Sequence, residues 1–153
     1  MNTGYYKSPI GVIELIYEDD YLLGLNFVNE DKNLTNEDEF FKKCSNELDE
    51  YFLGARKTFS INCKLNGTVF QKKVWQSLLK IPYGRTCSYK DIALNIENPK
   101  AVRAVGGANN KNKISIVIPC HRVIGSNGSL VGYGGDLWRK EWLLAHEKKY
   151  LDK

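Results

Sequence analysis

The first third of the chain alternates hydrophobic and polar positions in short blocks, a pattern that predicts an antiparallel meander of strands. The expected strands are residues 5–7, 11–17 and 21–28. A stripe at helical spacing follows, formed by Phe40, Phe41, Cys44, Leu48, Tyr51 and Phe52. We expect Asn36 to cap this helix and Gly54 to end it. No recognisable chemistry lies in these 60 or so residues, which we interpret as a small supporting unit.

The remainder of the chain is predicted to be mainly helical. Residues 58–61 have the composition of a short strand, and apolar positions then recur at helical spacing from Thr68, namely Val69, Phe70, Val74, Leu78 and Leu79. Ser88 is expected to cap a short helix running from Tyr89 to about Ile96. Asn98-Pro99 should open another helix at Lys100. Two short helices joined by a small turn form the outline of a helix-turn-helix.

The second of these short helices combines small residues with cations on one face. The positions that share this face are Lys100, Arg103, Ala104, Gly107 and Lys111. Glycines inside a helix cost about 1 kcal/mol each relative to alanine, so Gly106 and Gly107 suggest a close approach to another surface. That surface could be a polyanionic groove, with Arg103 wedged into a base stack. Tight packing of another helix against the glycines explains the pattern equally well.

A thiol and an imidazole follow the most apolar segment of the second half. Residues 114–118 are β-branched except for one serine and predict a buried strand, which Pro119 should end. Cys120 and His121 then lie at the end of that strand, where an imidazole could take a proton from a thiol. Because neighbours on an extended chain point to opposite sides, we expect a bridging water or a bend to link them. A buried structural cysteine beside a core histidine is the alternative, and for this pair alone it is favoured.

Composition and charge narrow the classes of function. The chain is 42% hydrophobic and 26% charged, as in soluble globular proteins, and no apolar run approaches the roughly 18 residues of a membrane span. The cysteines at 44, 63, 87 and 120 fit neither a zinc motif nor a disulfide framework, so we expect free thiols, no metal and a cytoplasmic location. Residues 1–65 carry 7 basic and 12 acidic side chains, whereas residues 66–153 carry 15 and 6. This asymmetry suggests a polyanionic partner for the second half, although a solvated lysine surface is the commoner cause of charge alone.

Several ordered motifs together resemble the O6-alkylguanine-DNA alkyltransferases over roughly residues 67–147. The resemblance is carried by residues 70–84, Ser88-Tyr89, residues 98–108, residues 118–123, Gly132-Tyr133-Gly134-Gly135 and residues 140–147. It implies an α/β fold with a small ribonuclease-H-like antiparallel sheet and helix over residues 1–64. Residues 65–153 would form a winged-helix-like (helix-turn-helix) alkyltransferase domain that binds DNA and carries the catalytic residues.

The resemblance also implies a catalytic role for each matching residue. Cys120 would be the nucleophile and the permanent acceptor of the alkyl group. His121 would deprotonate Cys120 through a water, and Glu147, which on its own pattern is a surface carboxylate, would orient the imidazole. Asn112 would hold the active-site loop by hydrogen bonds. Tyr89 would donate its hydroxyl to the departing guanine and help to push the base out.

Contacts to DNA are implied in the same way. Arg103 would fill the gap left by the flipped nucleotide, with Ala104 and Gly107 facing the minor groove. Contacts to the DNA backbone are implied for Gln71, Lys90, Asn98 and Ser126. The base pocket would be lined by Pro119, Val131, Gly132, Tyr133, Gly134 and Gly135. Gly134 stands where many relatives carry serine, so one side-chain contact to the base is absent.

The implied activity is repair of duplex DNA by irreversible, single-turnover transfer of the alkyl group from O6-alkylguanine, and from O4-methylthymine, after base flipping. No cofactor, no membrane and a monomeric state are implied. Two other classes remain. A non-catalytic damage-binding relative would have tryptophan in place of Cys120, and a cysteine hydrolase would leave the helix bearing Arg103 unexplained. The tolerated size of the alkyl group and cooperative assembly along DNA stay open.

Overall fold

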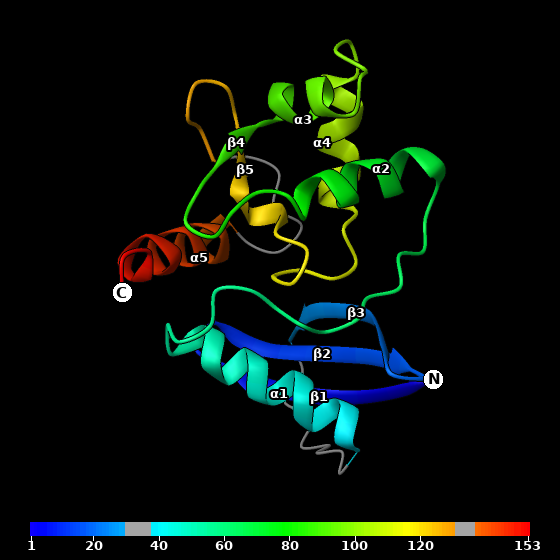
Figure 1. Ribbon diagram of the computed structural model, residues 1–153, viewed down its shortest axis with the longest axis vertical. Coiled ribbons are helices and arrows are strands. Elements are labelled where there is room, and N and C mark those ends of the chain that lie inside the picture. The colour runs from blue at the N-terminus through cyan, green and yellow to red at the C-terminus, as the bar shows by residue number, and fades with distance from the viewer. Residues whose placement is uncertain (30–37, 131–136) are drawn as a thin grey trace. The chain divides into compact units, whose positions relative to one another are not determined.

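The computed structural model describes residues 1–29, 38–130 and 137–153, which form two compact units, Met1–Leu65 and Asn66–Lys153 (Figure 1). The first unit contains a three-stranded antiparallel sheet in the order β1-β2-β3. Its strands are β1 (Asn2–Ser8), β2 (Gly11–Glu18) and β3 (Tyr21–Val28). Asp19 and Asp20 join β2 to β3 with φ values of 49° and 64°. Positive φ at both central residues matches the right-handed twist of a hairpin, and this explains the tight turn.

The helix of the first unit, α1 (Glu39–Phe52), packs on one face of this sheet (Figure 1). A Cβ atom added to Gly4 of β1 would overlap the Phe41 ring, so the helix and the strand approach closely there. The core that they share consists of Ile13, Leu15, Leu22, Leu25, Phe41, Cys44, Leu48 and Tyr51. Asp38 occupies the N-cap position, while Asn36 lies outside the described residues. Gly54 follows the helix with a φ of 82°, as a C-terminal glycine should.

The strand predicted at residues 58–61 is absent, and this prediction was wrong. The Ser60 N–H donates to Glu47 Oε1 at 2.9 Å, and the Thr58 carbonyl accepts from Arg56 Nη1 at 2.9 Å. Because side chains occupy these backbone groups, they do not join the sheet. The chain meets β3 only later, where Leu22 and Cys63 form an isolated parallel bridge.

The second unit is built from four helices and a short pair of parallel strands. The helices are α2 (Val69–Leu78), α3 (Tyr89–Asn95), α4 (Val102–Asn110) and α5 (Leu137–Tyr150), and β4 (Cys87–Ser88) pairs with β5 (Val123–Ile124). Thr68 begins α2 and Ser88 begins α3, each through a reciprocal capping box. The Trp75 indole N–H donates to the Ala108 carbonyl at 2.9 Å, which fixes α2 against α4. The expected α/β class and the helix-turn-helix of α3 and α4 are thus confirmed.

Details of the predicted helices differ from the structure. Val69 and Leu79 are 74% and 51% exposed, whereas Trp75, which the predicted stripe omitted, is buried. The fourth helix begins at Val102 and not at Lys100, because Ala101 has a ψ of 24° and its N–H closes a turn on the Asn98 carbonyl.

The segment 114–118 is buried as expected, but it is not a strand. Ile114, Ile116 and Ile118 are at most 2% exposed, and the backbone runs through consecutive turns with a φ of 72° at Ile116. The Ile118 N–H donates to the Ile114 carbonyl at 3.0 Å. The backbone groups are therefore satisfied locally, and tertiary burial overrides the strand propensity of the sequence.

Candidate active site

Cys120 opens a single turn of 3-10 helix, η1 (Cys120–Arg122), between Pro119 and β5. The residue is 3% exposed and Pro119 is also buried. Burial raises the pKa of the Cys120 thiol, whereas hydrogen bonds from Asn112 and Ser115 and the charge of Lys140 act in the opposite direction. The resting sulfur is therefore protonated, and it needs a base before it can act as a nucleophile.

His121 and Glu147 form a buried pair next to this thiol in the sequence. His121 Nε2 lies 2.7 Å from Glu147 Oε2, and neither side chain has any exposure. Arg122 Nε donates to Glu147 Oε1 at 2.8 Å, and Arg122 Nη2 donates to Oε2 at 3.0 Å. Burial by itself would raise the pKa of Glu147, but His121 and Arg122 together hold that pKa well below its usual range. Glu147 is thus an ionised carboxylate inside the protein.

The hydrogen bonding of His121 defines its basic nitrogen. Burial lowers the pKa of His121, with Glu147 opposing that effect, so the ring is neutral at physiological pH. Since Nε2 faces a carboxylate, Nε2 carries the hydrogen and Nδ1 holds the lone pair. Nδ1 is buried and has no hydrogen-bond partner among the described residues. A neutral imidazole with this tautomer can accept a proton at Nδ1.

Asn112 connects the turns before the nucleophile to the nucleophile itself. Its Nδ2 donates to the Ile118 carbonyl at 2.8 Å, and its Oδ1 accepts from the Ile114 N–H at 3.1 Å. The same side chain also hydrogen bonds to Cys120. These contacts substitute for the missing strand ladder, and they fix the path of the chain into η1.

Tyr89 is the first residue of α3 and lies close to the thiol. Burial raises the pKa of the Tyr89 phenol, the nearby Cys120 raises it further, and a hydrogen bond from Asn109 lowers it. Asn109 comes from α4, and its Nδ2 also donates to the Cys120 carbonyl at 3.3 Å. A protonated phenol therefore stands beside the candidate nucleophile, where it could donate to a leaving group.

The outer face of α4 carries Arg103, Ala104 and Gly107, all exposed. A Cβ atom at Gly107 would meet nothing within 4 Å, and one at Gly106 would make only ordinary contact with the Tyr89 ring at 3.9 Å. Packing within the described part of the chain does not require these glycines, which argues against the helix-packing alternative. The small-residue face is instead open to a partner from outside.

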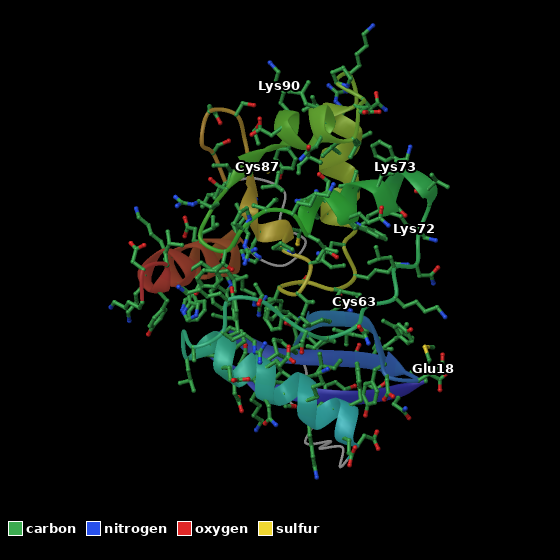
Figure 2. All side chains as sticks on the ribbon, viewed as in Figure 1. Glu18, Cys63, Lys72, Lys73, Cys87 and Lys90 are labelled. Atoms are coloured by element: carbon green, nitrogen blue, oxygen red, sulfur yellow. The ribbon has the colours of Figure 1, made fainter. Side chains whose placement is uncertain are left out.

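The remaining predicted positions are on α2, on α3 and in the turns of the second unit, or they lie outside the described residues. The Gln71 side chain accepts from the Thr68 N–H at 3.0 Å and so completes the cap of α2. Lys90, Asn98 and Ser126 are exposed. Figure 2 shows Lys90 on α3 and Lys72 and Lys73 on α2, so exposed cations extend over both helices. The predicted pocket residues Val131, Gly132, Tyr133, Gly134 and Gly135 lie outside the described ranges.

Sequence reasoning missed three residues of this site, namely Asn109, Lys140 and Arg122. Lys140 is fully buried, and its Nζ donates to the Val123 carbonyl at 2.5 Å. Its spacing from Leu143 and Glu147 places it on the inward face of α5, a signal that the sequence offered. Arg122 joins Glu147 to the Ile81 carbonyl, to which its Nη1 donates at 2.7 Å. Nothing in the pattern around Arg122 distinguishes it from a surface arginine.

Metal-binding clusters and membrane-spanning helices are both absent from the described ranges. No cluster of three or more histidine, cysteine, aspartate or glutamate side chains there could hold a metal ion. None of the described helices has the length and apolar character that crossing a membrane requires.

Comparison with known proteins follows the division into two units. Residues 1–65 match the family described as "6-O-methylguanine DNA methyltransferase, ribonuclease-like domain", and residues 69–149 match "6-O-methylguanine DNA methyltransferase, DNA binding domain". A methylated-DNA–protein-cysteine methyltransferase of Methanosarcina acetivorans is 47% identical, over 96% of this chain and 98% of the relative. A protein of Mycobacterium leprae with the same description is 46% identical, over 92% and 88%.

Solved structures show the same similarity. The crystal structure of Mycobacterium tuberculosis OGT in complex with DNA matches with a TM-score of 0.91 and 41% identity, over 98% of this chain and 94% of that one. An O6-methylguanine DNA methyltransferase from Methanococcus jannaschii matches with a TM-score of 0.69 and 28% identity, over 97% and 92%.

Proposed function

Because the chain belongs to the O6-methylguanine DNA methyltransferase family and is a DNA-repair methyltransferase, we propose that it moves the alkyl group of O6-alkylguanine in duplex DNA irreversibly onto Cys120. The observation that carries this proposal is the arrangement around η1. A buried thiol adjoins a buried His121–Glu147 pair, and a protonated tyrosine stands beside the thiol. The helix that contacts Cys120 through Asn109 also exposes Arg103.

The first chemical step is removal of the thiol proton. His121 Nδ1 accepts this proton through a bridging water and leaves a thiolate at Cys120. The ionised Glu147 stabilises the imidazolium that forms, in the manner of other triads in which a carboxylate orients a histidine. Arg122 and the Gly84 N–H, which donates to Glu147 Oε1 at 3.3 Å, hold the carboxylate in position.

The second step is a displacement at the sp3 carbon attached to guanine O6. A sulfur–carbon bond forms as the carbon–oxygen bond breaks, and the electron pair leaves with the base, which is then protonated. Tyr89 donates a hydrogen bond to the departing base and so stabilises its developing charge. The product at Cys120 is a thioether, and no group among the described residues would cleave it, so each molecule reacts once.

The target carbon lies inside a duplex, so the nucleotide has to leave the base stack at an energy of a few kcal/mol. We propose that the face of Arg103, Ala104 and Gly107 enters the minor groove and that Arg103 fills the gap. Lys90, Asn98 and Ser126 would contact the DNA backbone, together with Gln71. The net positive charge of residues 66–153 supports a binding that depends little on sequence and weakens with salt. O4-methylthymine presents the same alkyl–oxygen bond, and we include it as a substrate.

We further propose a monomer that works in the cytoplasm. All four cysteines are free thiols, which suits a reducing compartment, and a nucleophilic cysteine needs one.

Intact-mass measurement tests the proposed function directly. After incubation with a duplex that contains O6-methylguanine, the protein should gain one methyl group per molecule, and Cys120→Ser should gain none. Tight binding to the damaged duplex without any adduct would indicate a damage-binding protein. Repeated turnover of an ester or amide, abolished by Cys120→Ser, would indicate a cysteine hydrolase. Either result overturns the proposal.

A further inference from the structure

Asn109 lies at the contact between the helix-turn-helix and the nucleophile. Its side chain is 2% exposed and extends from the inner face of α4, opposite Arg103 and Ala104. Its Nδ2 donates to the backbone carbonyl of Cys120 at 3.3 Å. The side chain also forms a hydrogen bond with Tyr89, and the tyrosine ring would lie 3.9 Å from a Cβ atom added at Gly106 of the same helix. Asn109 therefore meets both the nucleophile and the phenol.

Among the described residues, the Asn109 side-chain amide uses its hydrogen-bond donors but not its acceptor. The hydrogen bond from Asn109 stabilises the ionised form of Tyr89, so Asn109 is the donor in it. The two hydrogens on Nδ2 are then divided between the Cys120 carbonyl and the Tyr89 oxygen. Asn109 Oδ1, in contrast, is buried and has no partner within the described part of the chain. An unpaired buried acceptor is unfavourable by about 1–3 kcal/mol, so the amide is retained here for its donors.

We infer that Asn109 is a positioning residue that fixes the Tyr89 hydroxyl relative to Cys120 and strengthens it as a donor to the leaving base. This inference rests on the proposed function, because it assigns a role in the departure of guanine. A phenol oxygen that accepts a hydrogen bond releases its own proton more readily. Guanine departure would therefore proceed more slowly without the Asn109 amide, while the thiol would still be deprotonated by His121.

The position of Asn109 also links DNA contact to chemistry. Arg103 and Asn109 lie on the same nine-residue helix, α4, one on its outer face and one on its inner face. A displacement of α4 by the DNA would move the amide relative to both Cys120 and Tyr89. The positions of the thiol and the phenol would thus depend directly on how α4 docks in the DNA groove.

A double-mutant cycle tests the inference. Asn109→Leu keeps the shape of the side chain but removes both donors, and Tyr89→Phe removes the hydroxyl. The single-turnover rate constant is measured with saturating O6-methylguanine duplex. We expect Asn109→Leu to slow transfer about tenfold in the otherwise wild-type protein, as for one lost hydrogen bond, and less than about twofold in the Tyr89→Phe protein.

Equal losses in the two backgrounds would show that Asn109 acts through the fold alone and would overturn the inference, as would the absence of any loss. Asn110→Leu, one residue further along α4 at an exposed position, is the matched control and should keep the wild-type rate. Thermal unfolding verifies that each variant is folded, and Asn109→Ala replaces Asn109→Leu if the leucine is not accommodated. If the wild-type protein gains no methyl group, the proposed function is wrong. If the wild type is methylated but the two substitutions act independently, only this inference is wrong.

Discussion

His121 and Glu147 are 26 positions apart in the sequence, and their Nε2 and Oε2 atoms lie 2.7 Å apart in the protein interior. Glu147→Gln would leave the imidazole without its anionic partner, so we expect a weaker base at His121 and a higher pKa for the Cys120 thiol. The rate of methyl transfer at neutral pH should fall by about 100-fold, within the range attributed to general-base catalysis. The pH–rate profile should move to higher pH. A profile that coincides with that of the wild type would count against the triad.

Acid should destabilise the protein through the same carboxylate. The pKa of Glu147 is far below its usual range in the folded state, whereas an unfolded glutamate titrates near 4.3. Below about pH 4.3 the unfolded chain takes up a proton that the folded protein does not, so this stabilisation is complete above that pH and is lost as the pH falls. We expect the free energy of unfolding in urea to fall more steeply between pH 5 and 3 for the wild type than for Glu147→Gln. Parallel declines would contradict this assignment.

Arg103→Ala should affect base flipping in duplex DNA but not the alkyl-transfer step itself. If Arg103 fills the space of the flipped nucleotide, its loss should slow repair of a duplex by about tenfold or more, since unstacking is worth a few kcal/mol. Reaction with free O6-benzylguanine, which needs no flipping, should be nearly unchanged. Arg85→Ala, at another exposed arginine of the second unit, serves as the control for lost positive charge. Equal slowing on both substrates would exclude the wedge role.

Lys140 is expected to assist the thiol through its charge. Its charge lowers the pKa of Cys120, while burial lowers the pKa of Lys140 itself. Lys140→Met keeps the length of the side chain and removes the charge, so the thiol should ionise at higher pH. The pH dependence of iodoacetamide alkylation at Cys120, followed by peptide mass, measures this shift. Arg139→Met, at the preceding residue, should not move the profile, and an unmoved profile for Lys140→Met would exclude an electrostatic role.

Two substitutions at Gly107 test the stability of the fold and the binding of DNA separately. Because no atom lies within 4 Å of its absent Cβ and its φ is not positive, Gly107→Ala should stabilise the folded protein by about 0.5–1 kcal/mol. Gly107→Leu should also fold, but it should bind duplex DNA more weakly if this face enters a groove. Fluorescence anisotropy with a labelled duplex measures the affinity. Undiminished binding by Gly107→Leu would place the DNA elsewhere.

The sequence predicted the site better where chemistry is local than where it depends on tertiary packing. The cap at Ser88 and the face of Arg103, Ala104 and Gly107 could be deduced from propensity and spacing. The turns at residues 114–118 could not, because their backbone is satisfied by Asn112, and strand propensity does not register such a side chain.

The sequence also could not show which distant residues are hydrogen-bond partners in the fold. Without the resemblance to a family, Glu147 would have been assigned to the surface, because its partners His121 and Arg122 come from a distant turn. The role of Asn109 could not be predicted either, because its two hydrogen-bond partners, Cys120 and Tyr89, lie on other segments. Lys140 was overlooked because lysine is almost never fully buried, and only its position on α5 indicated otherwise.

The indole of Trp75 is hydrogen bonded to the backbone of α4 and almost fully buried, whereas Trp138 is 48% exposed. Buried and hydrated indoles emit at different wavelengths, so Trp75 of α2 is an optical reporter that is hydrogen bonded to α4, the helix that we propose to enter DNA. Its emission could follow docking in real time without any attached dye.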